Sequence, residues 1–447
     1  MSELRVRNIY GKDGQPVAFP TGIRVGGPAG GPNAIAPMGG PGAGLGVCPG
    51  PLPLGLEALY GHNDPMSDTF GNYQFSDGSV MCWIPAFFYK FGTGANGLPV
   101  NTVDIKDFSE FTGVAAANAA GYALHRAFYD GGAIQPGVFI DKYHTSNNAG
   151  IASSLRNGDP LSSSSGHNPF SGLNGAPANN LAGAIAATKT RGANFFPASV
   201  FIFKALAMLS LGHGLASSAP TYCAWWHPAY PFPKGCNNSA LGDTNDPDLL
   251  FVSDGFENCC KTGSANLFAR TTHNGQNSGV ADVNGCIWDV APGLTMDNAD
   301  PAVGHFYVLK TSARMRDITG GNSAATDLWG SAGLAALYDD LGLMSDFTSY
   351  ALNFSDRYTP MGSASKVFSE AVSGLPWQMT GAGIPLVSGG SNRFGSDGLG
   401  DYSTNDMIPR CGGTWNNGGG AGVWALYFIN SRSTSDAGVG VRAALYL

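Results

Sequence analysis

The stretch that decides the fold lies near the carboxyl end of the 447-residue chain and reads Pro409-Arg410-Cys411-Gly412-Gly413-Thr414-Trp415-Asn416-Asn417. An aromatic and apolar run follows, Val423-Trp424-Ala425-Leu426-Tyr427-Phe428-Ile429. Trp424, Leu426 and Phe428 alternate with the residues between them, which is the period-two pattern of a β-strand. The segments on either side are rich in Gly, Asn and Ser, and we expect loops there. Because polar loops held by rigid strands often carry recognition residues, the sequence predicts a display surface at this end.

The side chains expected to contact a binding partner on this surface are tyrosine, asparagine, serine and arginine. Tyrosine offers contact area at low entropic cost, and asparagine and serine adapt their hydrogen bonds. The predicted contact residues are Tyr402, Asn405, Asn416, Asn417, Tyr427, Asn430, Arg432 and Ser433. Trp415 and one face of the strand around Trp424 are expected to belong to the core instead.

The same C-terminal stretch carries a resemblance to a known superfamily. Its motif residues are Arg410, Gly412-Gly413-Thr414-Trp415, Ser431-Arg432 and Gly440-Val441-Arg442, with the spacing of an "R-GGSW … R … GFR" signature. In this the chain resembles the C-type-lectin-like superfamily of formylglycine-generating-enzyme relatives, variable proteins of diversity-generating retroelements and bacteriophage tail-fibre tips. Valine stands where phenylalanine is usual before the last arginine, and Cys411 is inserted after Arg410. We expect Arg410 and Arg442 to form structural pairs rather than to touch a ligand.

Upstream blocks extend the resemblance to about residues 77–447. The aromatic run 77–91 resembles the "MVWIPKFYYK" strand of phage tail-fibre proteins. Residues 125–128 and 137–146 resemble the superfamily's "HPAF … GFYIGKYEAS" segment, and residues 279–290 resemble its "GVYDLNGNVWEW" strand. The resemblance implies an α+β, C-type-lectin-like domain with long loop insertions, which we expect near 147–190, 215–278 and 312–380.

One helix is expected to pack under the sheet, beginning within Asn194–Ser199 and running to about Leu211. Its apolar residues recur at steps of three and four, and glycines at 212 and 214 are expected to mark its end.

Residues 1–50 are expected to form an extended N-terminal arm, and residues 51–447 the globular domain. Residues 5–19 predict a short β-hairpin. From Gly26 to Gly46 the chain is nearly all Gly, Pro and Ala, which supplies too few side chains for a core of its own. We therefore expect this segment to lie against partner copies or a larger assembly.

Composition and charge exclude several classes of protein. The chain holds 65 Gly and 28 Pro with only 13% charged residues, which favours short strands and turns, while 11% aromatic residues argue for a folded core. With a net charge of −8 and no basic block, we expect no nucleic-acid binding. Met1–Arg7 lacks the apolar part of a signal peptide, and the run 195–211 is too short to cross a bilayer. We expect that the chain does not insert into a membrane and that it is synthesised in the host cytoplasm.

The eight cysteines show no framework spacing, so we expect reduced and mostly buried thiols. Cys223, Cys236, Cys259 and Cys260 cluster in the sequence but contain no C-x2-C pair, and zinc binding there is only an alternative. The acidic stretches 243–248 and 297–300 lack the EF-hand pattern and are expected to cap turns. We predict no metal and no cofactor.

Enzyme signatures are mostly missing. The chain has no G-x-S-x-G elbow and no H-E-x-x-H pair, and His125 and His144 are expected to be structural. Gly92–Gly97 matches a dinucleotide loop by letter, but Leu98-Pro99 opens no helix, so we predict a hairpin turn. Formylglycine-generating chemistry uses two cysteines after the "GGS" strand, and residues 416–422 contain none. We therefore predict that the chain is not an enzyme.

The resemblance implies a virion protein, a bacteriophage tail-fibre tip that binds a receptor on the bacterial surface, whether protein, pilus or polysaccharide. Residues 1–50 would join it to other tail or baseplate proteins, and similar tips are homotrimers. Two alternatives stay open. The first is a retroelement-diversified bacterial ligand-binding protein of the same fold, and the second is an oxidase or glycan-cleaving enzyme.

Overall fold

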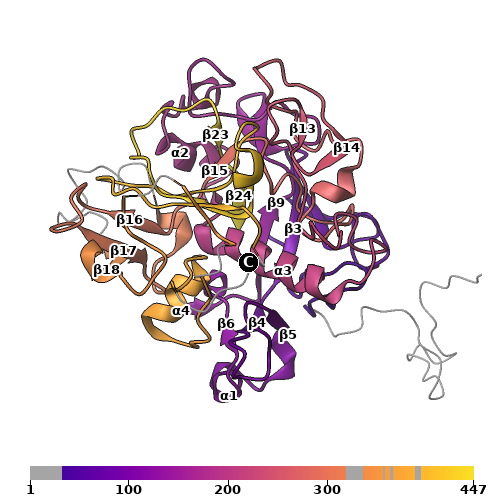
Figure 1. Ribbon diagram of the computed structural model, residues 1–447. Helices are drawn as coiled ribbons and strands as arrows, with labels where there is room; N and C mark the ends of the chain where they lie inside the picture. Colours follow the sequence, from indigo (N-terminus) through magenta and orange to yellow (C-terminus); the bar gives the residue numbers. More distant parts are fainter. Residues whose placement is uncertain (1–32, 319–335, 356–357, 363–365, 388–393) are drawn as a thin grey trace, which may run out of the picture.

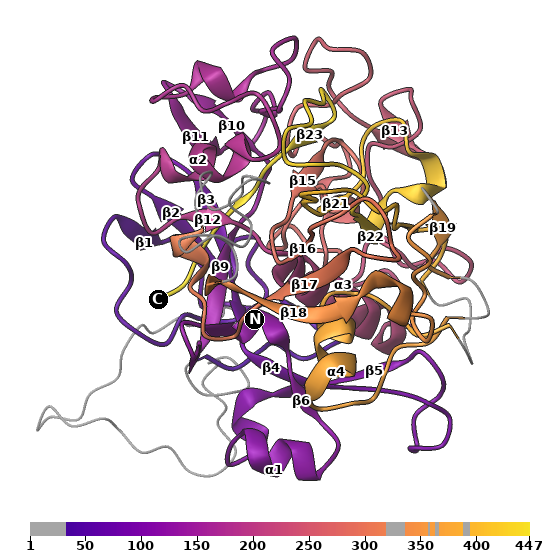
Figure 2. The same cartoon turned by 90° about the vertical axis from the view of Figure 1, so that its left-hand side faces the viewer.

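The computed structural model describes residues 33–318, 336–355, 358–362, 366–387 and 394–447. Within these residues two six-stranded sheets and several smaller ones surround a long helix (Figure 1, Figure 2). Strands predominate and helices are few, so the α+β class predicted from the sequence is confirmed. The hairpin expected at residues 5–19 lies outside the described residues.

The first six-stranded sheet joins strands from both ends of the described chain. Its order is β1 (Leu56–Ala58), β2 (Asn72–Phe75), β3 (Val80–Pro85), β9 (Gly137–Asp141), β24 (Ala443–Leu445) and β12 (Phe196–Pro197). Trp83 of β3 lies opposite Phe139 of β9, whose neighbour Ile140 lies opposite Ala444 of β24. The strands expected in residues 77–91 and 137–146 are confirmed. The aromatic run divides at Ala86, however, and its second half, β4 (Phe87–Phe91), belongs to another sheet.

The second six-stranded sheet holds the C-terminal motif. Its order is β19 (Thr359–Pro360), β20 (Gly398–Gly400), β22 (Gly422–Tyr427), β21 (Arg410–Gly412), β15 (Trp288–Val290) and β23 (Val439–Gly440). The expected alternation along β22 is confirmed, because Trp424 and Leu426 pack in one hydrophobic cluster and Ala425 and Tyr427 in another. Both faces of β22 are buried, whereas we expected one to be exposed, because a second apolar cluster around Trp288 covers that face.

The predicted helix is α3 (Val200–Ala216), which begins after Ser199, whose side chain accepts a hydrogen bond from the Ile202 amide. The predicted end is wrong, since Gly212 and Gly214 lie inside the helix. A Cβ on Gly214 would stand 3.0 Å from the Trp225 ring, so this glycine allows close packing instead of ending the helix. Lys204 is buried and donates to the carbonyls of Trp424 and Ala425, both at 2.9 Å, which ties α3 to β22.

No helix within the described ranges has the length and apolar character needed to cross a membrane. The remaining helices there are α1 (Val114–Ala119), α2 (Gly183–Lys189) and α4 (Gly374–Gly381).

Smaller sheets occupy the rest of the described chain. Two have three strands each: β5 (Val103–Asp107), β4 and β6 (Ala123–Leu124); and β16 (Leu294–Met296), β17 (His305–Leu309) and β18 (Tyr338–Leu343). Three are two-stranded: β7 (Tyr129–Asp130) with β8 (Ala133–Ile134), β10 (Thr145–Asn148) with β11 (Ile151–Ser154), and β13 (Gly242–Asp243) with β14 (Asp246–Leu250). The hairpin turn predicted at Gly92–Gly97 is confirmed, because it joins β4 to its antiparallel partner β5. The three stretches expected to be insertions thus contain short strands and helices of their own.

Residues 33–47 pack against the globular domain of the same chain, whereas we expected this segment to lie against partner copies or a larger assembly. Leu45 is fully buried in the main hydrophobic cluster. The Gly39 amide donates to Nδ1 of His213 at 2.9 Å, and the Gly42 amide donates to Oε1 of Gln276 at 2.7 Å. Gly42 has a φ of +70°, and a Cβ there would stand 2.4 Å from the Phe70 ring. The many glycines of this segment therefore permit close contact with the domain, which the sequence alone did not show.

A buried ion pair joins the two large sheets. Arg442 donates from Nε to Asp289 at 3.0 Å, and Asp289 also contacts Nδ1 of His144 at 3.1 Å. Arg410 pairs with Asp436 at 3.2 Å. The structural pairing predicted for both arginines is confirmed. The structural role of His144 is also confirmed, as is that of His125, whose Nδ1 accepts from the Ala127 amide.

Candidate functional site

The predicted contact residues do not form one patch, because the β21–β22 hairpin separates them. Arg410 lies opposite Tyr427, and Gly412 lies opposite Gly422. The loop 413–421 therefore leaves one end of this hairpin, whereas the segments before Arg410 and after Tyr427 lie at the other end. Asn416 and Asn417 belong to the first end; Tyr402, Asn405, Asn430, Arg432 and Ser433 belong to the second.

At the second end, the segments 401–409 and 428–434 run side by side. The Ile408 amide donates to the Asn430 carbonyl at 3.2 Å, and the Arg432 amide donates to the Asp406 carbonyl at 3.0 Å. The exposed side chains of this surface are Tyr402, Asn405 and Ser433, and Asn430 is half-buried. These four predicted contact residues are brought to one end of the hairpin.

Two predicted contact residues are not on the surface. Tyr427 is 7% exposed, and its ring packs 4.6 Å from the ring of Trp288. Arg432 is 3% exposed; its Nε lies 2.7 Å from Asp406 and its guanidinium donates to Oγ1 of Thr295 at 3.0 Å. The expectation that they are exposed is wrong, because an aromatic partner and a carboxylate from distant segments bury them. The sequence pattern did not show these partners.

At the first end, the loop 413–421 borders a pocket of about 510 Å³. Asn416 is exposed and Asn417 half-buried, and the pocket wall includes Gly419 from the same loop. The stretch 226–234 also lines the pocket and contributes aromatic side chains to it. There the rings of His227 and Tyr230 stack with centroids 5.7 Å apart and an interplanar angle of 24°.

A hydrogen-bonded polar wall fixes this loop in place. The Gly418 amide donates to the Asn237 carbonyl at 2.8 Å. The Asn237 side chain donates to Asp243 at 3.1 Å and to Oδ1 of Asn284 at 2.9 Å. The pocket lining includes Asn237, Asp243 and Asn284. This part of the lining is therefore polar, and its side chains are hydrogen-bonded to one another.

Burial shifts the pKa values of three ionisable side chains that line the pocket. Desolvation raises the pKa of Asp397 to about 7, against the hydrogen bond from the Trp424 amide and the attraction of Lys204, which lower it. Burial likewise raises the pKa of Asp243 and lowers the pKa of Lys234. Lys234 donates to the Tyr230 carbonyl at 2.9 Å, with its ammonium 5.6 Å from the centre of that ring. The pocket therefore offers aromatic rings on which a ligand can stack and polar side chains to which it can hydrogen-bond. This suits a polar ligand with a flat face.

Sequence reasoning does not predict this pocket, because it identifies the stretch 215–278 as an insertion and leaves its role open. A signal was present in Trp226-His227-Pro228-Ala229-Tyr230-Pro231-Phe232-Pro233-Lys234, where aromatic residues alternate with prolines that stiffen the chain. What the sequence did not show is that this stretch lies beside the loop 413–421, almost two hundred residues later.

The cysteines group differently from the sequence prediction. Cys236, Cys259, Cys260 and Cys286 share one hydrophobic cluster with Trp415, whereas Cys223 lies outside it. Seven of the eight cysteines are buried, as predicted, and Cys48 is intermediate. The turn-capping role predicted for the acidic stretches is confirmed, since Asp243 accepts from the Asn245 amide and Asp300 from the Ala302 amide.

Comparisons with known proteins find similarity in structure but not in sequence. No protein-family model matches the chain, and no curated protein matches it in sequence. The chain is similar to the Major Tropism Determinant U1 variant, with 12% identity and a TM-score of 0.29 over 83% of this chain and 65% of that one. It is also similar to the Major Tropism Determinant M1 variant, with 14% identity and a TM-score of 0.29 over 82% of this chain and 63% of that one. The chain thus matches less than two thirds of the length of either protein.

Proposed function

We propose that this chain is the receptor-binding protein at the tip of a bacteriophage tail fibre and attaches the virion to the bacterial surface. One observation carries the proposal: the motif residues Arg410, Trp415 and Arg442 are buried within the fold, while polar loops beside them are exposed. Buried motif residues make a rigid scaffold, and exposed Asn, Ser and Tyr side chains make adaptable contacts. This is the arrangement that recognition requires, and it needs no catalytic step.

The receptor contact that we propose lies at the pocket end of the β21–β22 hairpin. Asn416 is exposed there, beside the pocket that His227 and Tyr230 line. Tyrosine is enriched among the residues that dominate binding energy, because it buries a large area with few torsions. The surface around Tyr402 and Ser433, at the opposite end, serves as the internal comparison.

The remaining parts of the proposal concern assembly. Since residues 33–47 pack on the domain, the attachment to other tail or baseplate proteins falls to the residues before them. A homotrimeric tip would present three equal sites on one fibre, and avidity would then raise the overall affinity far above that of one site. Such a protein would be assembled in the host cytoplasm and would end up in the virion.

Adsorption competition tests the proposal. Purified protein in excess is mixed with host cells before phage is added, and free phage is counted. Wild-type protein should block adsorption, and Tyr230→Ala and Asn416→Ala should each raise the half-blocking concentration at least about tenfold, which corresponds to about 1.4 kcal/mol. Tyr402→Ala and Ser433→Ala are the matched exposed variants and should leave it unchanged.

The outcomes separate the function from the location of the contact. Unchanged adsorption in the presence of excess wild-type protein would overturn the attachment function. Blocking that is lost with Ser433→Ala but kept with Tyr230→Ala would keep the function and move the contact to the other end of the hairpin.

A further inference from the structure

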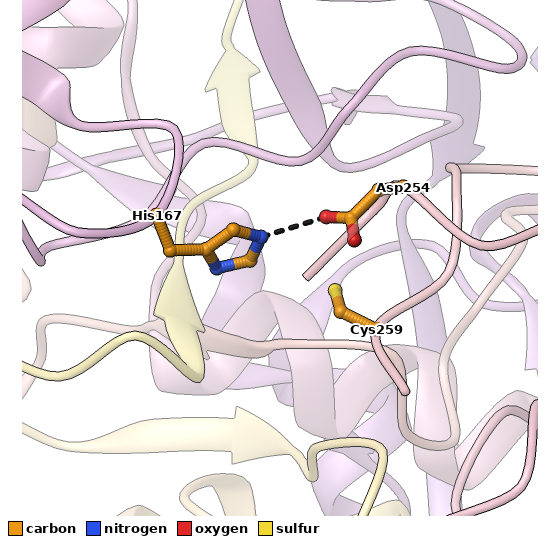
Figure 3. Close-up of side chains that lie close together, drawn as sticks. All are labelled: His167, Asp254 and Cys259. Atoms are coloured by element: carbon orange, nitrogen blue, oxygen red, sulfur yellow. Dashed lines mark hydrogen bonds and ion pairs between the residues drawn. The ribbon is translucent and has the colours of Figure 1, made fainter. Parts of the chain in front are cut away.

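A buried cluster of metal-ligating side chains lies outside the pocket and the contact surfaces. Asp254 and Cys259 lie on one loop and His167 on a distant one, and the ligand atoms of the three residues all lie within 4.8 Å of one another. Nε2 of His167 is 2.7 Å from Asp254, and the side chains of both residues are at most 2% exposed. Figure 3 shows the Cys259 sulfur pointing toward the carboxylate of Asp254.

The second ring nitrogen of His167 has a partner of its own. Nδ1 lies 2.7 Å from the Ala437 carbonyl, which can only accept a hydrogen bond, so Nδ1 carries the proton. The ring also stacks on Phe256, with centroids 4.2 Å apart and an interplanar angle of 15°. A histidine that donates one N–H to a backbone carbonyl and turns its other nitrogen to a carboxylate and a thiol is oriented as metal ligands usually are.

A second thiol adjoins the cluster. Sγ of Cys259 lies 3.9 Å from the Cys286 carbonyl, and Sγ of Cys286 donates to the Cys260 carbonyl at 3.3 Å. Cys286 has a φ of +68°, a left-handed conformation that is costly for a residue with a side chain. The group of ligand atoms that lie within 4.8 Å of one another includes Cys259 and not Cys286, so Cys286 lies beside the cluster.

Nucleophilic catalysis does not explain this cluster. A cysteine nucleophile needs a histidine nitrogen free to take its proton, and here Nδ1 is bound to a carbonyl and Nε2 to Asp254. Cys259 is also fully buried, so no substrate can reach its sulfur. An imidazolium–carboxylate pair alone accounts for His167 and Asp254 but gives no reason for the Cys259 thiol beside them.

We propose that His167, Asp254 and Cys259 bind one zinc ion, with Nε2, a carboxylate oxygen and a thiolate sulfur as ligands. Imidazole nitrogen, carboxylate oxygen and thiolate sulfur are the usual protein ligands of zinc, and three of them leave the fourth tetrahedral position to a water molecule. In a tetrahedral site with usual bond lengths the ligand atoms stand about 3.3–3.8 Å apart, and here they lie within 4.8 Å of one another, so the cluster needs shifts of about an ångström. Binding releases the Cys259 thiol proton to solvent, and the thiolate and the carboxylate together balance the charge of the ion.

Such an ion would stabilise the C-terminal motif. Nδ1 of His167 donates a hydrogen bond to the Ala437 carbonyl, and the neighbouring Asp436 pairs with Arg410 of the motif. Trp415 lies in the same cluster as the cysteines, and its Nε1 donates to Glu257 at 3.2 Å. The zinc would therefore join two inserted segments to the last loop of the chain, a role that does not depend on what the exposed surface binds.

Metal titration of the full chain tests the proposal. Protein is stripped with a chelator, and Zn²⁺ is added while heat and the unfolding temperature are recorded. We expect one zinc per chain and a higher unfolding temperature, because an ion that binds only the folded state stabilises it. His167→Gln and Cys259→Ser should weaken zinc binding at least about tenfold. Cys223→Ser, a buried cysteine outside the cluster, is the matched control and should bind as wild type does.

Cobalt gives a spectroscopic readout, both in the wild-type protein and in the variants. Co²⁺ in the wild-type protein should show the visible bands of tetrahedral coordination and a thiolate-to-metal charge-transfer band. The charge-transfer band should be lost in Cys259→Ser and kept in Cys223→Ser. A wild-type chain that takes up no zinc, or a folded Cys259→Ser that binds zinc equally well, would overturn the proposal. If Cys259→Ser does not fold, a wild-type cobalt spectrum without the charge-transfer band would also overturn the proposal.

Discussion

Arg410 of β21 lies directly opposite Tyr427 of β22, with its guanidinium carbon 5.9 Å from the centre of the Tyr427 ring. The same guanidinium stands 5.2 Å from the Trp288 ring and pairs with Asp436 at 3.2 Å. Arg410, a motif residue, and Tyr427, a predicted contact residue, therefore belong to one internal stack. Arg410 is 8% exposed, and this burial lowers its pKa, with Asp436 opposing the shift.

Replacing Tyr427 should consequently cost stability rather than receptor contact alone. Tyr427→Ala removes a buried ring from its packing against Trp288 and Arg410, and we expect it to lower the free energy of unfolding by about 3–4 kcal/mol. Tyr402→Ala, at a residue that is 39% exposed, should stay within about 0.5 kcal/mol of wild type. Urea unfolding of the two variants measures the difference. Equal costs for both would mean that Tyr427 is not packed as described.

Arg442 should be the most sensitive of the motif residues. Besides its pairing with Asp289, it donates to the carbonyls of Lys142 at 3.0 Å and Asp282 at 3.1 Å. Arg442→Met keeps much of the side-chain volume but leaves the buried Asp289 carboxylate with His144 in place of a permanently charged partner, so we expect a loss of about 3–5 kcal/mol.

The control for this loss is Lys106→Met, which breaks a pair with Glu110 in which the lysine is 33% exposed. Exposed ion pairs contribute about 0.2–1 kcal/mol. Denaturant midpoints of both variants supply the comparison, and a cost below about 1 kcal/mol for Arg442→Met would contradict the buried network.

What the sequence predicted well were features with strong local periodicity or composition. The strands in 77–91 and 137–146, the helix around Phe201 and the abundance of turns all follow from patterns within a few residues of each other. The structural roles of Arg410 and Arg442 came from the motif, and their ion pairs with Asp436 and Asp289 confirm them.

What the sequence did not predict depends on contacts between distant segments. The burial of Arg432 is due to Asp406 and Thr295, and the pocket forms where the stretch 226–234 meets the loop 413–421. The division of the contact residues between two hairpin ends follows from strand pairing, which residue types alone do not determine.

The docking of residues 33–47 can be tested at a single glycine. Gly42→Ala forces a residue with a side chain into a φ of +70° and places its Cβ 2.4 Å from the Phe70 ring, so we expect a loss of about 2–4 kcal/mol. Gly97→Ala has a similar φ of +86° but no atom within 4 Å of the new Cβ, and should cost only about 1 kcal/mol. Thermal and urea unfolding of the pair isolates the packing contribution. Equal effects would indicate that this segment does not pack on the domain.

Asp397 should make stability depend on pH near neutrality. Burial raises its pKa to about 7 in the folded protein from an ordinary value of 3.8, so the folded state holds this proton more tightly than the unfolded state does. The stability that the protonated group contributes is therefore fully present below about pH 4, and is lost as the pH rises through about 7. Asp397→Asn removes the titration and can still accept the hydrogen bond that the Trp424 amide donates at 2.8 Å. Between pH 5 and pH 8, wild type should lose about 2–3 kcal/mol relative to this variant, because other groups titrate equally in both. Asp248→Asn, at a side chain that is 77% exposed, is the control and should show no such change relative to wild type. Urea unfolding at the two pH values measures the difference, and parallel curves for wild type and Asp397→Asn would show that Asp397 is ionised throughout.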